Sequence, residues 1–249
     1  EYLKNLNFLN RKVINKYNKH LKLRHKGKLI RSHDNMNANY KKKMFTKSQI
    51  LKKLKVKKTN KFDSIILFAA HVFADGPHGC GKMIFDDYFQ QLILSVEKMK
   101  KNKNVLYILK SHPSSFLLNE EGFLENYYYK NKLFKYDNIK ICPKDIKTNS
   151  LLSIIDTVAT CSGSAGLELA AFYGKRPILA GASYYSNLGF TQDCKDQKEY
   201  YKFFANPNLL KKLSRKDKIN ANKCLYLVEC SYKEHNIGNF FPKNIRIYK

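Results

Sequence analysis

Lys110, His112 and Pro113 directly follow an apolar segment, 105–109, that has the length and composition of a buried strand. Such a strand has no local need for a lysine and a histidine at its carboxyl end, where side chains leave the sheet and enter a crevice. An imidazole can give a hydrogen bond or a positive charge to a phosphate oxygen, and proline fixes the backbone beyond the strand. The segment therefore predicts an anion contact by His112, supported by Lys110. The alternative is a loop histidine that caps a neighbouring helix.

Small and hydroxylated residues follow a second short apolar segment, 157–160, and lead into a helical pattern. They are Ser162, Ser164 and Gly166, with Glu168 one turn further on. Backbone N–H groups at a helix start attract phosphate, and the serine hydroxyls add donors. The Glu168 carboxylate could accept hydrogen bonds from ribose hydroxyls. Ordinary N-capping by a serine, with Glu168 answering the helix dipole, is the alternative. Capping needs only one of these residues, so the cluster favours a nucleotide-phosphate site.

A third polar group, His71, Asp75 and His78, follows the apolar segment 64–70. Asp75 could act as nucleophile or general base, while the two histidines orient or donate. A plain Asp-Gly-Pro turn explains Asp75 almost as well.

Metal and cofactor motifs find little support in the sequence. Asp86 and Asp87 resemble a metal-binding pair, but carboxylates before an amphipathic helix more often cap it and complement its dipole. The six cysteines form no C-x-x-C pair, which argues against a zinc site or a redox dithiol and predicts buried, reduced thiols. No Gly-x-Gly-x-x-Gly or Walker motif appears. We therefore expect no metal and no cofactor.

The net charge of +27 is unevenly distributed: residues 1–62 hold 20 of the 47 basic residues and only two acids. We expect a basic N-terminal extension or linker over 1–62 and a nucleotide-binding domain over 63–249. The charge suggests an anionic partner, although a compositional bias toward Lys, Asn, Ile and Tyr also explains it. No run approaches the roughly 18 apolar residues of a membrane span, and no leader resembles a signal peptide, so we expect a cytoplasmic protein. A chain that opens on Glu1 suggests a piece of a longer polypeptide.

Strand and helix patterns alternate from residue 63 onward, which predicts an α/β fold: a Rossmann-like parallel sheet with helices on both faces. The expected strands are 64–70, 105–109, 139–142, 157–161 and 177–180. The expected helices are 46–54, 86–101, 119–133, 149–155, 165–173, 198–213 and 216–228. Ligands of such a sheet lie beyond the carboxyl ends of its strands.

The Lys-x-His-Pro segment, followed by Ser-Gly-Ser-Ala-Gly-Leu-Glu and the further residues to 181, and by 184–191, resembles the C-terminal half of capsule polysaccharide biosynthesis proteins. These are Kdo transferases with the two-domain GT-B glycosyltransferase fold, and the similarity covers roughly 46–193. The resemblance implies a CMP-sugar donor, and no metal, because protein donors neutralise the leaving CMP. The implied catalytic residues are His112 and Asp75, and the implied donor-binding residues are Lys110, Pro113, Ser162, Ser164, Gly166 and Glu168. Residues 1–62 are too few and too polar to build the second half of such an enzyme.

The expected function is transfer of a sugar, with Kdo expected, from its CMP form to a glycan or lipid-linked acceptor. His112, as a protonated imidazole, would stabilise the departing phosphate, and the basic region would hold the protein at anionic lipids of the inner membrane face. One alternative is a polyol-phosphate transferase with a CDP-glycerol donor. The other is a non-catalytic module whose basic stripe, 41–61, grips nucleic acid. Nucleic acid ranks last, because it does not explain polar clusters at strand ends.

Overall fold

The computed structural model describes residues 44–56, 61–76 and 81–229. Six parallel strands form one sheet in the order β3-β2-β1-β4-β5-β6. They are β1 (Ser64–Ala69), β2 (Val105–Lys110), β3 (Ile139–Ile141), β4 (Thr157–Thr160), β5 (Ile178–Leu179) and β6 (Gln192–Asp193). This order makes the sheet Rossmann-like, and the predicted α/β fold class is confirmed.

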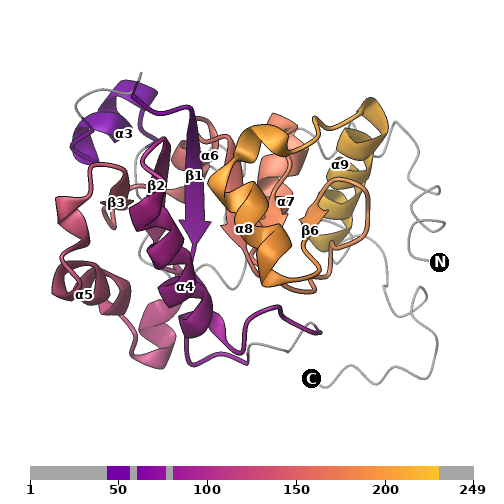
Figure 1. The fold of residues 1–249 in the computed structure, drawn as a ribbon. Coiled ribbons are helices and arrows are strands. Elements are labelled where there is room, and N and C mark those ends of the chain that lie inside the picture. The colour runs from indigo at the N-terminus through magenta and orange to yellow at the C-terminus, as the bar shows by residue number, and fades with distance from the viewer. Residues whose placement is uncertain (1–43, 57–60, 77–80, 230–249) are drawn as a thin grey trace.

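Helices cover both faces of the sheet. One face carries α4 (Tyr88–Lys101), α5 (Phe123–Lys130) and α8 (Gln197–Ala205), and Figure 1 shows α4 and α8 in front of the strands. The other face carries α3 (Lys47–Lys53), α6 (Thr148–Leu152), α7 (Ser164–Glu168), its π-helical continuation η6 (Leu169–Tyr173) and α9 (Arg215–Glu229). Three short 3-10 turns complete the described elements: η4 (Ser115–Leu118), η5 (Leu133–Lys135) and η7 (Pro207–Leu209).

The apolar strands are explained by burial on both faces. In β1, Ile66 and Phe68 point to the α4 and α8 side, whereas Leu67 points to the α3 and α6 side. Successive side chains of a strand alternate between faces, so a strand covered on both sides must be apolar throughout. Each of these three side chains is almost completely buried.

Helix α4 is amphipathic, and its start shows what the paired acids do. Leu92, Val96 and Met99 are fully buried at the three- and four-residue spacing of one helix face. Asp87 is the N-cap, and its carboxylate accepts a hydrogen bond from the Gln90 amide at 2.6 Å. Asp86 accepts from the side chain of Gln90. The prediction that these acids cap the helix is confirmed.

Three elements differ from the sequence prediction for local reasons. The helix expected over 119–133 begins only at Phe123, because Asn119 (φ 57°) and Gly122 (φ 83°) adopt left-handed backbone. The helix expected over 198–213 ends at Ala205, before Pro207 starts a 3-10 turn. The two-residue strand β6 was not predicted, because it is too short to show a period.

The short helix α3 lies on the N-terminal side of the boundary expected at residue 62, yet it belongs to the core. Thr46 and Gln49 form the capping box that the sequence predicts. Ile50 and Leu54 are buried in the cluster on the α6 face, and the Phe45 amide donates to Ser150 Oγ at 3.2 Å. Residues 1–43 lie outside the described residues, so the basic extension stays a prediction.

Two further predictions concern the chain as a whole. Cys142, Cys161, Cys194 and Cys224 are buried free thiols, as expected, whereas Cys80 and Cys230 lie outside the described residues. In the part of the chain that the structure describes, every helix is too short or too polar to cross a membrane.

Candidate functional site

The ends of three neighbouring strands bring polar residues together. His71 follows β1, His112 follows β2 and Ser162 follows β4, and these strands are adjacent in the sheet. The His71 and His112 rings are nearly parallel, with centroids 6.3 Å apart. The Ser162 amide donates to His71 Nε2 at 3.1 Å. The strand order reverses between β1 and β4, so His71 and Ser162 lie at the switch point where ligands of such sheets bind.

His112 is held as a neutral hydrogen-bond donor. Its Nδ1 accepts the Ser114 amide proton at 3.1 Å, so the ring proton of the neutral form is on Nε2. Burial lowers the pKa of His112, while the charges of Asp75 and Glu120 act in the opposite direction. This differs from the expected imidazolium. Before a ligand arrives, the ring offers an N–H group rather than a full charge.

His71 is also neutral, and its ring is tightly packed. Its pKa is lowered to about 4 by burial and, secondarily, by His112, against a raising effect of Asp75. The ring stacks on Tyr88 of α4 with centroids 4.4 Å apart. The Thr160 hydroxyl lies 3.3 Å from Nε2, the atom that accepts from Ser162. The sequence suggested an orienting or donating role for His71, but it did not reveal these partners.

The turn after β4 is not an ordinary serine cap. Gly163 is the N-cap of α7, it makes no side-chain capping bond, and the first turn contains no acid. The alternative prediction was a serine cap with an acid that answers the helix dipole, and α7 has neither a serine cap nor an acid in its first turn. The amides of Ser162 and Gly163 are nevertheless bound within the protein, by His71 and by Thr160 Oγ1 at 3.3 Å. The groups left at this turn for a ligand are the half-buried Ser162 and Ser164 side chains and the amides that open α7.

Gly166 serves close packing at this turn. A Cβ atom at this position would lie 2.6 Å from the hydroxyl oxygen of Tyr185, a fully buried residue of the loop after β5. That hydroxyl donates to the Gly163 carbonyl at 2.6 Å. Gly166 is thus needed so that Tyr185 can reach the turn. Tyr185 lies in the segment 184–191 that contributes to the family resemblance, but the sequence analysis assigned no role to it.

Asp75 lies on the exposed loop after β1, close to both histidines. Its Oδ1 accepts the Gly76 amide proton at 2.9 Å, as a turn residue would. Its charge still raises the pKa of His71 and of His112, which places it on their side of the sheet. Glu120 anchors the same loop by accepting from the Phe73 amide at 2.7 Å and from its neighbour's at 2.5 Å. His78 lies outside the described residues.

Three predicted site residues remain: Lys110, Pro113 and Glu168. Lys110 Nζ donates to the Ile146 carbonyl at 2.9 Å, so its ammonium secures the connection between β3 and α6. Pro113 is exposed in the turn that follows His112. Glu168 is the last residue of α7, and its charge adds to burial in raising the pKa of Tyr173. The structure thus brings His71, His112 and Ser162 together, whereas the Lys110 ammonium is bound to the Ile146 carbonyl.

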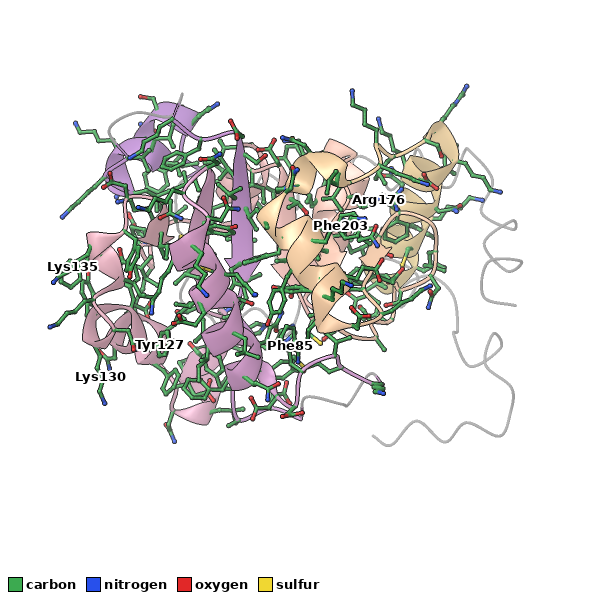
Figure 2. All side chains as sticks on the ribbon, in the orientation of Figure 1. Phe85, Tyr127, Lys130, Lys135, Arg176 and Phe203 are labelled. Atoms are coloured by element: carbon green, nitrogen blue, oxygen red, sulfur yellow. The ribbon has the colours of Figure 1, made fainter. Side chains whose placement is uncertain are left out.

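An open hollow of about 810 Å³ lies at the carboxyl ends of β5 and β6. Its walls are 82–86, 181–182, 186–187 and 193–198, and Figure 2 shows Phe85 of this wall near the end toward which β1 points. Gly181 in the wall packs so closely on Cys161 that a Cβ would lie 2.6 Å from its sulfur atom. The hollow therefore borders the turn after β4, and its size suits a small-molecule ligand. Among the residues described, no three His, Cys, Asp or Glu side chains group as metal ligands would.

Comparison with known proteins agrees with this fold. A solved structure of Thermosulfurimonas dismutans KpsC, beta Kdo 2,4 transferase, superposes with a TM-score of 0.50 and 17% sequence identity. The match covers 86% of this chain but 56% of KpsC, so the chain spans little more than half of that protein. At such identity the likeness concerns the fold alone. Comparison with curated proteins found no match.

The family comparison goes further, because it covers most of the chain. The family model described as "Capsule polysaccharide biosynthesis protein" matches residues 2–226, a wider region than the 46–193 that carry the motifs. The resemblance inferred from the Lys-x-His-Pro and Ser-Gly-Ser-Ala-Gly segments is confirmed. The chain belongs to the capsule polysaccharide biosynthesis protein family.

Proposed function

We propose that this protein is a glycosyltransferase of capsule or surface polysaccharide biosynthesis, which transfers a sugar from a CMP-activated donor to a glycan or lipid-linked acceptor. The observation that carries the proposal is the meeting of His112, His71 and the Ser162 turn at the switch point of the sheet. Family membership and the transferase activity named for KpsC support sugar transfer, with Kdo as the sugar.

In this proposal His112 receives the donor phosphate. Its Nε2–H donates to a phosphate oxygen while Nδ1 stays fixed by the Ser114 amide. As the bond to the sugar breaks, negative charge grows on the leaving CMP, and a donor already aimed at that oxygen stabilises it. The growing charge also raises the pKa of the ring, so protonation becomes easier as the reaction proceeds. The hydroxyls of Ser162 and Ser164 supply further donors, so the step needs no metal.

Asp75 is the residue we propose for activating the acceptor or attacking the sugar. It is exposed on the loop after β1, where a second molecule can reach it, and its charge acts on both histidines. A carboxylate there can take the proton of an acceptor hydroxyl or form a bond to the sugar. Glu168 and the 810 Å³ hollow remain candidates for holding the nucleoside and sugar.

The described residues form one Rossmann-like half of the proposed GT-B arrangement. In that arrangement the acceptor binds to a second half, across the crevice from His112. The proposal therefore assigns donor binding to this chain, and donor binding is the property to test first.

The test is calorimetric titration of the full chain with CMP. His112→Asn is the informative variant, because its Oδ1 can still accept the Ser114 amide proton while the Nε2–H donor is lost. We expect affinity for CMP to fall about 10- to 100-fold, the range for a hydrogen bond to a charged group. Ser153→Ala is the matched control: that hydroxyl donates to the Ser150 carbonyl in α6, so CMP binding should not change.

Two results would contradict the proposal at different points. If the wild-type chain binds no CMP, the CMP-donor assignment fails. If His112→Asn binds CMP as the wild type does, His112 is not the phosphate contact. Competition between CMP-Kdo and CDP-glycerol then tests the donor class, because stronger binding of CDP-glycerol would favour a polyol-phosphate transferase.

The proposed association with anionic lipid is tested separately. Residues 1–62 hold 20 basic residues, and each one near a surface contributes about 1 kcal/mol of attraction to anionic lipid. We expect binding to phosphatidylglycerol vesicles that weakens with added salt and is absent for phosphatidylcholine vesicles. Equal binding to both kinds of vesicle would argue against an electrostatic anchor.

A further inference from the structure

His71 lies between helix α4 and the carboxyl ends of β2 and β4. It is the second residue after β1, its ring stacks on Tyr88 of α4, and the parallel ring of His112 lies on the β2 side. Its Nε2 faces β4, where it lies 3.1 Å from the Ser162 amide nitrogen and 3.3 Å from the Thr160 hydroxyl. One ring thus contacts residues of the neighbouring strand ends on both sides of β1.

We propose that His71 is a positioning residue: by accepting the Ser162 amide proton, with the Thr160 hydroxyl beside the same nitrogen, it fixes the turn between β4 and α7 in the geometry used for phosphate binding. The inference rests on the proposed function only for the identity of the phosphate ligand. The hydrogen bonds that carry it are properties of the protein alone.

The chemistry of the ring determines which tautomer can do this. A backbone N–H can only donate, so the bond from Ser162 requires a lone pair on Nε2. The neutral ring therefore carries its proton on Nδ1. His112 has the opposite arrangement, with Nδ1 accepting and the proton on Nε2. The two parallel rings thus have different tasks: His112 offers a donor, whereas His71 offers an acceptor to the backbone.

The turn is held from a second side, which shows that its geometry is tightly defined. Tyr185 donates to the Gly163 carbonyl at 2.6 Å, while Thr160 Oγ1 receives the Gly163 amide proton. A Cβ atom at Gly163 would lie 2.8 Å from Thr160 Oγ1 and 3.8 Å from His71 Nε2. These contacts leave no room for a side chain at residue 163, so the turn packs closely on both Thr160 and His71.

Different atoms of the turn therefore bind His71 and the ligand. The Ser162 amide is bound to His71, so the phosphate contact within this residue falls to the Ser162 hydroxyl. The inference assigns His71 no direct contact with the ligand. It acts on the ligand through the backbone conformation of residues 162 and 163.

Two substitutions distinguish the effect of the Nε2 acceptor from the effect of the aromatic ring. His71→Gln places Oε1 near the position of Nε2 and keeps an acceptor for Ser162, whereas His71→Phe keeps the stack on Tyr88 and removes the acceptor. Calorimetry with CMP and hydrogen exchange of the Ser162 amide are measured on the full chain. In His71→Phe we expect about tenfold weaker CMP binding and about tenfold faster exchange, the effect of one lost hydrogen bond. His71→Gln should keep both values within about threefold of the wild type.

The outcomes separate this inference from the proposed function. Failure of the wild-type chain to bind CMP contradicts the proposed function, and Ser162 exchange then decides the role of His71. Equal exchange in the wild type and both variants overturns the inference, as does unchanged CMP affinity in His71→Phe. If His71→Phe does not fold, nitrogen NMR of the wild type decides: an unprotonated Nε2 coupled to the Ser162 amide supports the inference, and a protonated Nε2 overturns it.

Discussion

The two ends of the strands use polar side chains in different ways. At the amino end, Asn138 Nδ2 donates to the carbonyls of Met99 and Asn102, both at 2.8 Å, and Asp156 accepts the Ile65 amide proton at 2.8 Å. Arg176 Nη1 donates to the carbonyls of Gly189 and Thr191. The Arg176 carbonyl accepts from the hydroxyl of Thr157, the first residue of β4, at 2.7 Å, and Figure 2 shows Phe85 toward the end where β1 finishes. Polar groups at the amino end join loops to strands.

At the carboxyl end, the same kinds of side chain use one atom for the fold and present another to the crevice. His112 is bound through Nδ1, and its Nε2 has no hydrogen bond to any residue that the structure describes. Ser162 is bound to His71 through its amide, and its half-buried hydroxyl has no hydrogen bond to any residue that the structure describes. Residue type alone therefore does not identify a binding group. A polar atom that makes no hydrogen bond within the protein, next to one that does, identifies it.

Acidic pH should destabilise the carboxyl end most. A histidine whose pKa is lowered in the folded state is bound neutral, while the unfolded chain takes up a proton near pH 6.5. The stabilisation is therefore complete above about pH 6.5 and is lost as the pH falls toward the folded pKa of His71, about 4. Over that interval His71 should lower the free energy of unfolding by about 3 kcal/mol, and His112 should add a smaller loss. Urea unfolding between pH 7 and 4.5 measures the decline.

The control for this prediction is His71→Gln, which cannot titrate but keeps an acceptor for Ser162. Its decline should be shallower than that of the wild type. The other titratable groups near the ring, His112, Asp75 and Glu120, stay in place in both proteins. Identical slopes for both proteins would show that folding does not lower the pKa of His71.

At the amino end, Asn138→Ala should weaken the fold and leave ligand binding alone. Asn138 is 3% exposed, and its amide nitrogen supplies two carbonyls at the end of α4. Leaving those acceptors without a donor should cost about 2 kcal/mol in the free energy of unfolding. CMP affinity should stay at the wild-type value when measured well below the melting temperature. Reduced affinity in the folded variant would break the distinction between the two ends.

The sequence predicts the strands well because burial on both faces leaves a continuous apolar pattern, as in Val105–Lys110. It also predicts that His112 and Ser162 lie at one edge, since parallel strands end together. What it could not reveal are contacts between residues far apart in the chain that have no local pattern. The bond from Ser162 to His71 spans 91 positions and the bond from Tyr185 to Gly163 spans 22. Similarly, nothing in the residues around Lys110 indicates that its ammonium reaches the Ile146 carbonyl.

Tyr185→Phe tests how the carboxyl end of the sheet is held, because this buried side chain supports the turn after β4. The substitution removes one hydroxyl that donates to the Gly163 carbonyl at 2.6 Å and leaves the ring in place. We expect a loss of about 1 to 1.5 kcal/mol in the free energy of unfolding, the value of one buried hydrogen bond. CMP affinity should fall by about threefold to tenfold, because the turn loses its second support. Unchanged affinity would show that His71 and Thr160 fix the turn without the Tyr185 hydroxyl.

Asp87→Ala has the smallest expected effect, and it tests whether every acid at the carboxyl end belongs to the site. Asp87 caps α4 by accepting the Gln90 amide proton at 2.6 Å, and loss of such a cap costs about 1 kcal/mol. Because its carboxylate is directed to the helix, CMP affinity should not change. Asp87→Asn, which can still accept that proton, should recover most of the stability by urea unfolding. If instead Asp87→Asn stays as unstable as Asp87→Ala, the charge of the carboxylate stabilises α4 more than its hydrogen bond does. If either variant binds CMP less tightly, Asp87 contributes to the site, and a side chain bound within the fold can also act on the ligand.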